Sequence, residues 1–164
     1  MTDGIDATQP LWFYDFVSPF SYLLLEQHDK WPGLPFALTP VLLNDLYRHW
    51  GQRVAYDVPA KRIFTYRYAL FRAEQLGIPF RMPPSHPFDS TKPMLLSVAL
   101  GSDLHTVREI FRFIWREGRD PSSEEGFEQL CVGFEIRSIS GFRPQLLAGT
   151  GIKAVVQGQF QYLG

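Results

Sequence analysis

The sequence predicts an α/β fold in which one strand–helix–strand (βαβ) unit is followed by a long helical segment. Two features predict this fold: β-prone apolar runs at residues 11–16 and 36–43 flank a stretch with helical spacing, and helix start and stop residues recur between residues 59 and 131. With 164 residues, 45% of them hydrophobic, the chain can bury a substantial core in one domain. We expect a single domain, residues 1–164, in three parts: a βαβ unit (11–43), a helical insertion (44–135) and an atypical tail (136–164).

The βαβ unit is defined by its helix start and its second strand. Ser18 is a natural N-cap, and the proline after it occupies the first helical position, where a missing N–H has no consequence. Pro40 restricts the second strand to a sheet edge or a bulged end. A strand–helix–strand crossover of this length connects parallel strands with right-handed geometry.

Start and stop residues predict four helices after this unit. The first begins at Pro59 and ends at Gly77. Its expected buried face consists of Ile63, Tyr66, Leu70 and Ala73. The expected N-caps of the other three are, in chain order, Asp89 or Ser90, then Ser102, then Ser122, which would form a capping box with Glu125.

Composition and charge exclude several classes of protein. A single cysteine allows neither an intramolecular disulfide nor a cysteine zinc cluster, and Cys131 is expected to be a buried, inert thiol rather than a nucleophile. The net charge of −1 gives no general attraction for nucleic acid. The apolar runs fall far short of the roughly 20 residues that span a bilayer.

Location, metal binding and the arginine-rich face follow from similar observations. The N-terminus, with Asp3 and Asp6, lacks a basic apolar leader, so we expect a cytoplasmic protein without a membrane partner. The four histidines lack metal-ligand spacing, and we expect no metal site. The arginines at 108, 112, 116 and 119 interleave with glutamates and are expected to form a solvated, ion-paired helix face.

Ser18 is the candidate catalytic residue. A helix N-terminus presents unpaired N–H groups and a partial positive charge, which favour an anion. Ser18 either caps the helix only, or also donates a hydrogen bond to an anionic ligand, and the neighbouring aromatic residues suggest a walled pocket. One hydrogen bond to a charged group contributes about 1.5–3 kcal/mol. For a ligand whose anionic group is a thiolate, such a bond would lower the pKa of the bound thiol by roughly one to two units.

Three blocks of sequence occur in order between residues 11 and 131. They are Asp15-Phe16-x-Ser18-Pro19-Phe20-Ser21-Tyr22-Leu23; then Pro59-Ala60-Lys61, Gly77-Ile78-Pro79-Phe80 and Pro83-Pro84-x-His86-Pro87-Phe88-Asp89; then Glu117-Gly118-Arg119-Asp120-Pro121. Together they resemble the 2-hydroxychromene-2-carboxylate isomerases, which belong with the kappa-class glutathione transferases in the DsbA-like branch of the thioredoxin superfamily. The resemblance implies a DsbA-like thioredoxin fold with a large helical insertion, and Ser18-Pro19-Phe20-Ser21 takes the place of the Cys-x-x-Cys motif.

The resemblance also implies a glutathione-dependent isomerase. Its glutathione thiolate would add to a conjugated carbon of the substrate, allow rotation, and leave again, with Ser18 facing the sulfur. Phe20 and Lys61 would contact glutathione, although Lys61 is also compatible with a solvated helix start. Phe64 and Asp89 would contact the substrate. Relatives often carry Tyr at the position of Phe64 and usually carry Asn at the position of Asp89, which is also a candidate N-cap. The resemblance further implies a homodimer.

The tail departs from the family pattern. The family expects a Gly-Val-Pro-Thr-like segment whose cis-proline loop pairs with glutathione, followed by a β-hairpin and a last helix, but no proline follows Pro144. A shifted reading frame or a truncation near residues 131–137 is our hypothesis for this loss. Two alternative functions therefore stay open: kappa-type glutathione conjugation or peroxide reduction, and a non-catalytic remnant that binds a partner through the helical insertion.

Overall fold

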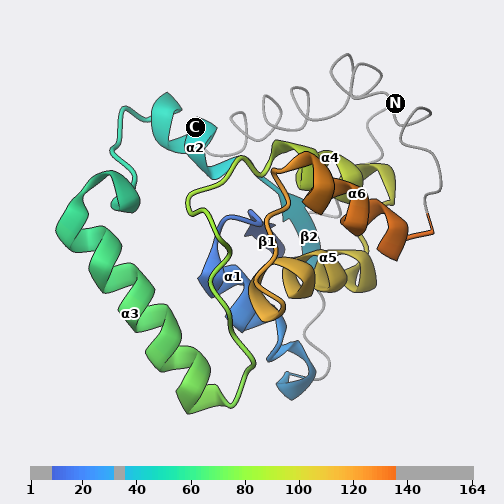
Figure 1. Ribbon diagram of the computed structural model, residues 1–164, viewed down its shortest axis with the longest axis horizontal. Helices are drawn as coiled ribbons and strands as arrows, with labels where there is room; N and C mark the ends of the chain where they lie inside the picture. Colours follow the sequence, from blue (N-terminus) through green and yellow to red (C-terminus); the bar gives the residue numbers. More distant parts are fainter. Residues whose placement is uncertain (1–8, 32–35, 136–164) are drawn as a thin grey trace.

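The computed structural model describes residues 9–31 and 36–135, and the predictions for the tail lie outside these residues. Within these ranges the sheet has two strands, β1 (Leu11–Tyr14) and β2 (Ala37–Pro40), which pair in parallel from Leu11 opposite Ala37 to Tyr14 opposite Pro40 (Figure 1). The predicted parallel pairing is confirmed, and Pro40 lies at the end of its strand. Each strand is shorter than its apolar run, because the chain leaves β1 after Tyr14 towards α1 and leaves β2 after Pro40 towards α2.

Helix α1 (Pro19–Leu25) connects the two strands and begins as the sequence predicted. The Ser18 hydroxyl oxygen accepts a hydrogen bond from the Ser21 amide at 3.3 Å, and Pro19 occupies the first helical position. A short 3-10 turn, η1 (His28–Lys30), follows the helix. The N-cap prediction is therefore confirmed for the segment that carries the candidate site.

The helical insertion contains five α-helices among the described residues, one more than predicted. They are α2 (Leu43–His49), α3 (Pro59–Leu76), α4 (Thr91–Ala99), α5 (Leu104–Phe111) and α6 (Glu124–Gly133), with a 3-10 turn η2 (Ala55–Asp57) and a π-helical segment η3 (Arg112–Arg116). The missed helix α2 has no side-chain N-cap. Figure 1 shows α3 on the far side of α1 from α4, α5 and α6.

The core lies where β1 and α1 meet α4, α5 and α6. Its largest fully buried side chains include Trp115, Tyr14, Phe16 and Phe111. The Phe16 and Phe111 rings lie 4.8 Å apart in an edge-to-face arrangement, one that aromatic pairs favour. Cys131 is fully buried in this core, as predicted, and burial raises the pKa of its thiol.

The predicted buried face of α3 is right for Ala73 and in part for Tyr66, which is half-buried, and wrong for Ile63 and Leu70. Ala69 and Ala73 are buried, whereas Ile63 and Leu70 are 52% and 47% exposed. The helix carries aromatic or aliphatic residues on nearly every side, so its periodicity does not single out one face. The two small alanines allow the helix to lie close to its neighbour α1.

Two of the predicted N-caps are wrong by one residue. Asp103, rather than Ser102, caps α5 by accepting from the Thr106 amide at 2.9 Å. Ser123, rather than Ser122, caps α6 by accepting from the amide three residues later. In each case two adjacent residues are competent caps, and only the backbone conformation decides between them.

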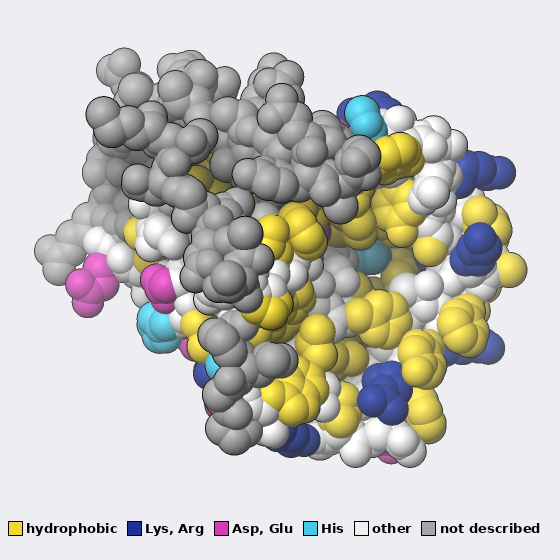
Figure 2. Space-filling view, turned by 180° about the vertical axis from the view of Figure 1, so that it is seen from behind, with side chains coloured by type: hydrophobic (Ala, Val, Ile, Leu, Met, Phe, Trp, Pro, Cys, Tyr) yellow, Lys and Arg dark blue, Asp and Glu magenta, His cyan; other side chains and the backbone are white. Residues whose placement is uncertain are grey.

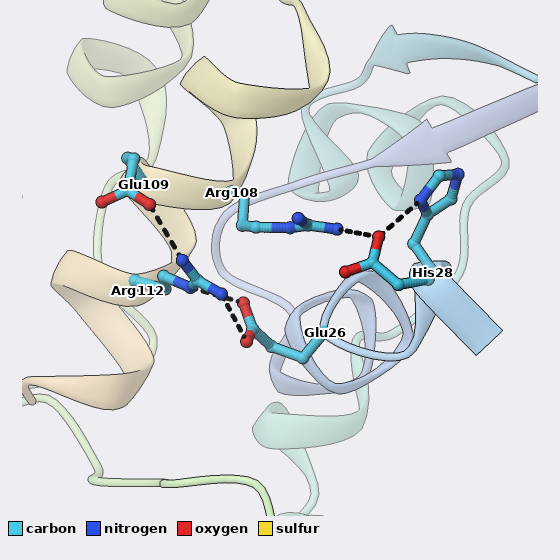
Figure 3. A network of polar contacts seen from close by, with 6 residues as sticks. Glu26, His28, Arg108, Glu109 and Arg112 are labelled. Atoms are coloured by element: carbon cyan, nitrogen blue, oxygen red, sulfur yellow. Dashed lines mark hydrogen bonds and ion pairs between the residues drawn. The ribbon is translucent and has the colours of Figure 1, made fainter.

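Three of the four arginines of the predicted face, Arg108, Arg112 and Arg119, form ion pairs, and the first two are less solvated than expected (Figure 3). Arg112 binds both carboxylate oxygens of Glu26 at 2.8 and 3.0 Å and one oxygen of Glu109 at 3.1 Å. The Glu26 side chain is only 12% exposed. Arg108 reaches Asp29 at 3.2 Å. The two arginines therefore connect α5 and η3 with the end of α1 and with the turn η1 that follows it.

Candidate functional site

The loop between β1 and α1 is anchored by Asp15, a buried carboxylate that is 3% exposed. One of its oxygens accepts from the Val17 amide at 3.0 Å, and the other accepts from the Leu43 amide at 2.7 Å. Burial raises the pKa of Asp15, and the two backbone hydrogen bonds oppose this shift. The carboxylate thereby connects the turn before Ser18 with the start of α2.

The carbonyl groups of the same loop are held from outside. Trp115 Nε1 donates to the Phe16 carbonyl at 2.9 Å, and His86 Nε2 lies 2.8 Å from the Val17 carbonyl. The Asp15 carbonyl accepts from the Ser18 amide at 3.0 Å. Because amides and carbonyls of consecutive residues have partners, the backbone that carries Ser18 is fixed from both sides.

Ser18 lies half-buried at the end of this loop. A hydroxyl group has one hydrogen to donate and two lone pairs to accept with. The Ser21 amide uses one lone pair, and the hydroxyl hydrogen has no acceptor among residues 9–31 and 36–135. Capping and ligand binding are therefore compatible at Ser18.

A row of exposed aromatic rings leads away from Ser18 across α1 and α3. The Phe20 ring lies 5.8 Å from that of Tyr68, which stacks on Phe64 at 5.6 Å. The three side chains are 39%, 42% and 65% exposed, in the same order. Two predicted site residues, Phe20 and Phe64, thus lie on one surface, joined by Tyr68, which the sequence analysis did not single out.

An open groove of about 570 Å³ follows this face of α3. Its lining residues are Ala60, Ile63, Phe64, Arg67, Tyr68 and Phe71. Figure 2 shows hydrophobic side chains interspersed with Lys and Arg over the part of the molecule where α3 lies. The groove therefore offers apolar surface next to positive charge.

The two predicted charged site residues differ in their surroundings. Lys61 is exposed in the first turn of α3, and within the described part of the chain no ion pair involves it. Asp89 is exposed and its carboxylate accepts from the Thr91 amide at 2.9 Å, but the N-cap residue of α4 is Ser90, the other of the two predicted candidates. The negative charge of Asp89 contributes to the raised pKa of Asp15, and Asp89 is not among the residues that line the groove along α3.

His86 and Tyr66 complete the surroundings of the loop; neither was predicted as a site residue, and Tyr66 was expected only on the buried face of α3. The Tyr66 hydroxyl lies 2.8 Å from His86 Nδ1 and 3.0 Å from the His86 carbonyl oxygen. Burial lowers the pKa of His86, although the hydrogen bond to Val17 opposes this. The position of His86 between prolines in the second sequence block was the available signal.

Metal binding and membrane insertion are without structural support in the described ranges. No group of three or more His, Cys, Asp or Glu side chains there is arranged to hold a metal ion. Among the same residues, no helix combines the length and the apolar character that crossing a membrane requires.

Comparison with known proteins identifies the family. Residues 11–140 match the family model described as the DSBA-like thioredoxin domain. The chain belongs to this family. A solved structure of a 2-hydroxychromene-2-carboxylate isomerase (HCCA isomerase) superposes with a TM-score of 0.73 at 21% sequence identity, over 93% of this chain and 77% of the isomerase. This DsbA-like chain thus has the predicted fold. No curated protein sequence matches it significantly.

Proposed function

We propose that this protein is a glutathione-dependent isomerase that acts on 2-hydroxychromene-2-carboxylate or a related conjugated aromatic keto acid. The observation that carries the proposal is the half-buried Ser18 hydroxyl, whose hydrogen is available to a ligand and whose backbone is fixed. The likeness in fold to an HCCA isomerase supports the choice of reaction.

The residues around Ser18 fit glutathione in their chemistry. A thiolate needs a hydrogen-bond donor, which Ser18 supplies, and a bound tripeptide needs a partly apolar surface, which Phe20 and Tyr68 supply. Lys61 gives an exposed cation for a carboxylate, either of glutathione or of the substrate. Phe64 extends the apolar surface towards a planar substrate.

In this mechanism the chain acts through position and electrostatics. The chemistry that bound glutathione supplies is reversible thiolate addition to a conjugated carbon. Ser18 donates to the sulfur and so favours its charged form at neutral pH, without acting as a base. The two hydrogen bonds of the Asp15 carboxylate, from the Val17 and Leu43 amides, hold the loop that carries Ser18, so that little reorganisation is needed when the substrate binds.

Calorimetric titration with glutathione and an isomerisation assay test the proposal together. The protein should bind glutathione and convert the chromene acid only when glutathione is present. S-methylglutathione is the matched control, because it keeps the peptide groups but cannot form a thiolate. Absence of binding heat at millimolar glutathione, or equal conversion with both compounds, would contradict the proposal.

The exposed face of α3 favours a second candidate function. Ile63, Phe64 and Phe71 are each about half or more exposed on one helix, and exposed apolar patches often mark interaction sites. A non-catalytic module that binds a partner through this face would show no glutathione binding. A kappa-type transferase would instead bind glutathione and conjugate electrophilic aryl halides. The homodimer and the cytoplasmic location stay predictions.

A further inference from the structure

We propose that His86 is a positioning residue that holds Ser18 in the geometry needed to bind a thiolate. This inference rests on the proposed function, because it concerns how the Ser18 hydroxyl is aimed. It adds a residue from the loop after α3, 68 positions beyond Ser18 in the chain, to the residues that hold the loop between β1 and α1.

The hydrogen bond between His86 and Val17 fixes the ring's tautomer. A carbonyl oxygen can only accept, so Nε2, at 2.8 Å from the Val17 oxygen, carries the ring hydrogen. The other ring nitrogen, Nδ1, lies 2.8 Å from the Tyr66 hydroxyl, which also donates to the His86 carbonyl oxygen at 3.0 Å. Both ring nitrogens have partners on different elements, which determines the direction of the donated hydrogen bond.

The ring is also held by its aromatic neighbours. The rings of Trp115, Tyr66 and Tyr56 lie 5.3, 5.2 and 6.0 Å from it, centre to centre. Trp115 itself donates to the carbonyl of Phe16, immediately before Val17. The same packed group therefore contacts two consecutive carbonyls of the loop.

The consequence for Ser18 follows from peptide geometry. The carbonyl of Val17 and the amide of Ser18 belong to one planar peptide unit. His86 binds the carbonyl end, and the Asp15 carbonyl binds the amide end at 3.0 Å. With both ends held, the plane cannot rotate, and the position of the Ser18 Cα, from which the side chain extends, is set. Loss of the His86 contact would free one end of this unit.

Two variants separate the hydrogen bond from the packing. His86→Gln keeps an N–H donor at nearly the position of Nε2, whereas the side chain of His86→Asn is too short to reach the Val17 carbonyl. Both lose the ring and its aromatic contacts, so their unfolding free energies should fall by similar amounts. His105→Asn, at an exposed position, controls for the loss of a histidine elsewhere.

The readouts are the pKa of the thiol of bound glutathione, from thiolate absorbance, and the dissociation constant for glutathione. His86→Asn should raise the thiol pKa by about half to one unit and weaken binding about three- to tenfold, while His86→Gln should stay close to wild type. Equal values in the two variants would overturn the inference, because a purely structural role predicts no difference between them.

Amide hydrogen exchange tests the same inference without glutathione. The Ser18 amide should exchange about three- to tenfold faster in His86→Asn than in His86→Gln. If wild type binds glutathione but this exchange is equal in both variants, the role of His86 is refuted and the proposed function stands. If wild type binds no glutathione, the proposed function is refuted, and with it the catalytic meaning of the His86 contact.

Discussion

Replacing Asp15 by Asn should destabilise the protein by about 1–3 kcal/mol. The carboxylate accepts from two backbone amides, of Val17 and Leu43, and is 3% exposed. An asparagine side chain has one oxygen, so its NH₂ group would face one of these amides, and a buried N–H would lose its acceptor. For a chain of this length a loss of 2 kcal/mol lowers the Tm by roughly 4–8 °C.

Urea unfolding at neutral pH measures this loss, and Asp89→Asn is the matched control. Asp89 also accepts a hydrogen bond from a backbone amide, but its side chain is exposed. Because Asn is as good as Asp at the start of a helix, the control should stay within about 0.5 kcal/mol of wild type. Equal stability of Asp15→Asn and wild type would refute the stabilising role of the two hydrogen bonds that Asp15 accepts.

The pH dependence of the same pair of proteins gives a second check on Asp15. Burial raises the pKa of Asp15, so the folded state binds its proton more tightly than the unfolded state does. The proton-linked part of the stability that Asp15 contributes is therefore fully present below its ordinary pKa and is lost as pH rises through the raised one, whereas the part due to the two backbone hydrogen bonds remains at neutral pH. The difference between wild type and Asp15→Asn should shrink over that pH range, and a difference that grows instead would contradict the assigned shift.

Three further predictions concern the core and the helix contacts. Glu26→Gln should lower the free energy of unfolding by urea by about 1–2 kcal/mol, because it breaks a largely buried bidentate ion pair with Arg112. Glu117→Gln, in an exposed ion pair, should lower it by under about 0.5 kcal/mol. Equal losses would count against a stabilising role of the buried pair. Gly126→Ala should destabilise the protein by about 2 kcal/mol or more, because the added Cβ would collide with the carbonyl oxygen of Asp120. Gly133→Ala, whose Cβ would meet nothing within 4 Å, should be neutral or slightly stabilising. The midpoints of thermal unfolding of the two variants check this. Cys131 should react with a thiol reagent only on unfolding, since it is fully buried with a raised pKa, and rapid labelling of the native protein would be inconsistent with that environment.

Local sequence signals predicted those parts of the fold that local chemistry decides. The cap at Ser18, the helix start at Pro59 and the stop at Gly77, whose φ of +65° suits glycine, all lie within one turn of the residues that determine them. The parallel pairing of β1 with β2 followed from the length of the crossover. The predicted N-caps failed where two adjacent residues were both competent, as at Ser102 and Asp103.

The parts that sequence reasoning missed depend on distant contacts. The buried face of α3 is set by how closely α1 approaches Ala69 and Ala73, which the helix's own pattern does not reveal. The contact between His86 and Val17 joins residues 69 positions apart. Tyr68 was missed for the same reason, since its role as the connection between Phe20 and Phe64 needs two helices to be placed side by side.

The central claim is that the Ser18 hydroxyl stabilises a thiolate that the chain does not itself supply. The most direct measurement is the pKa of the thiol of glutathione bound to wild type, to Ser18→Ala, and to Ser21→Ala as the neighbouring serine whose hydroxyl has no assigned role. Ser18→Ala should raise this pKa by roughly one to two units with an unchanged fold, and Ser21→Ala should leave it as in wild type. The same pKa in all three proteins would contradict the claim.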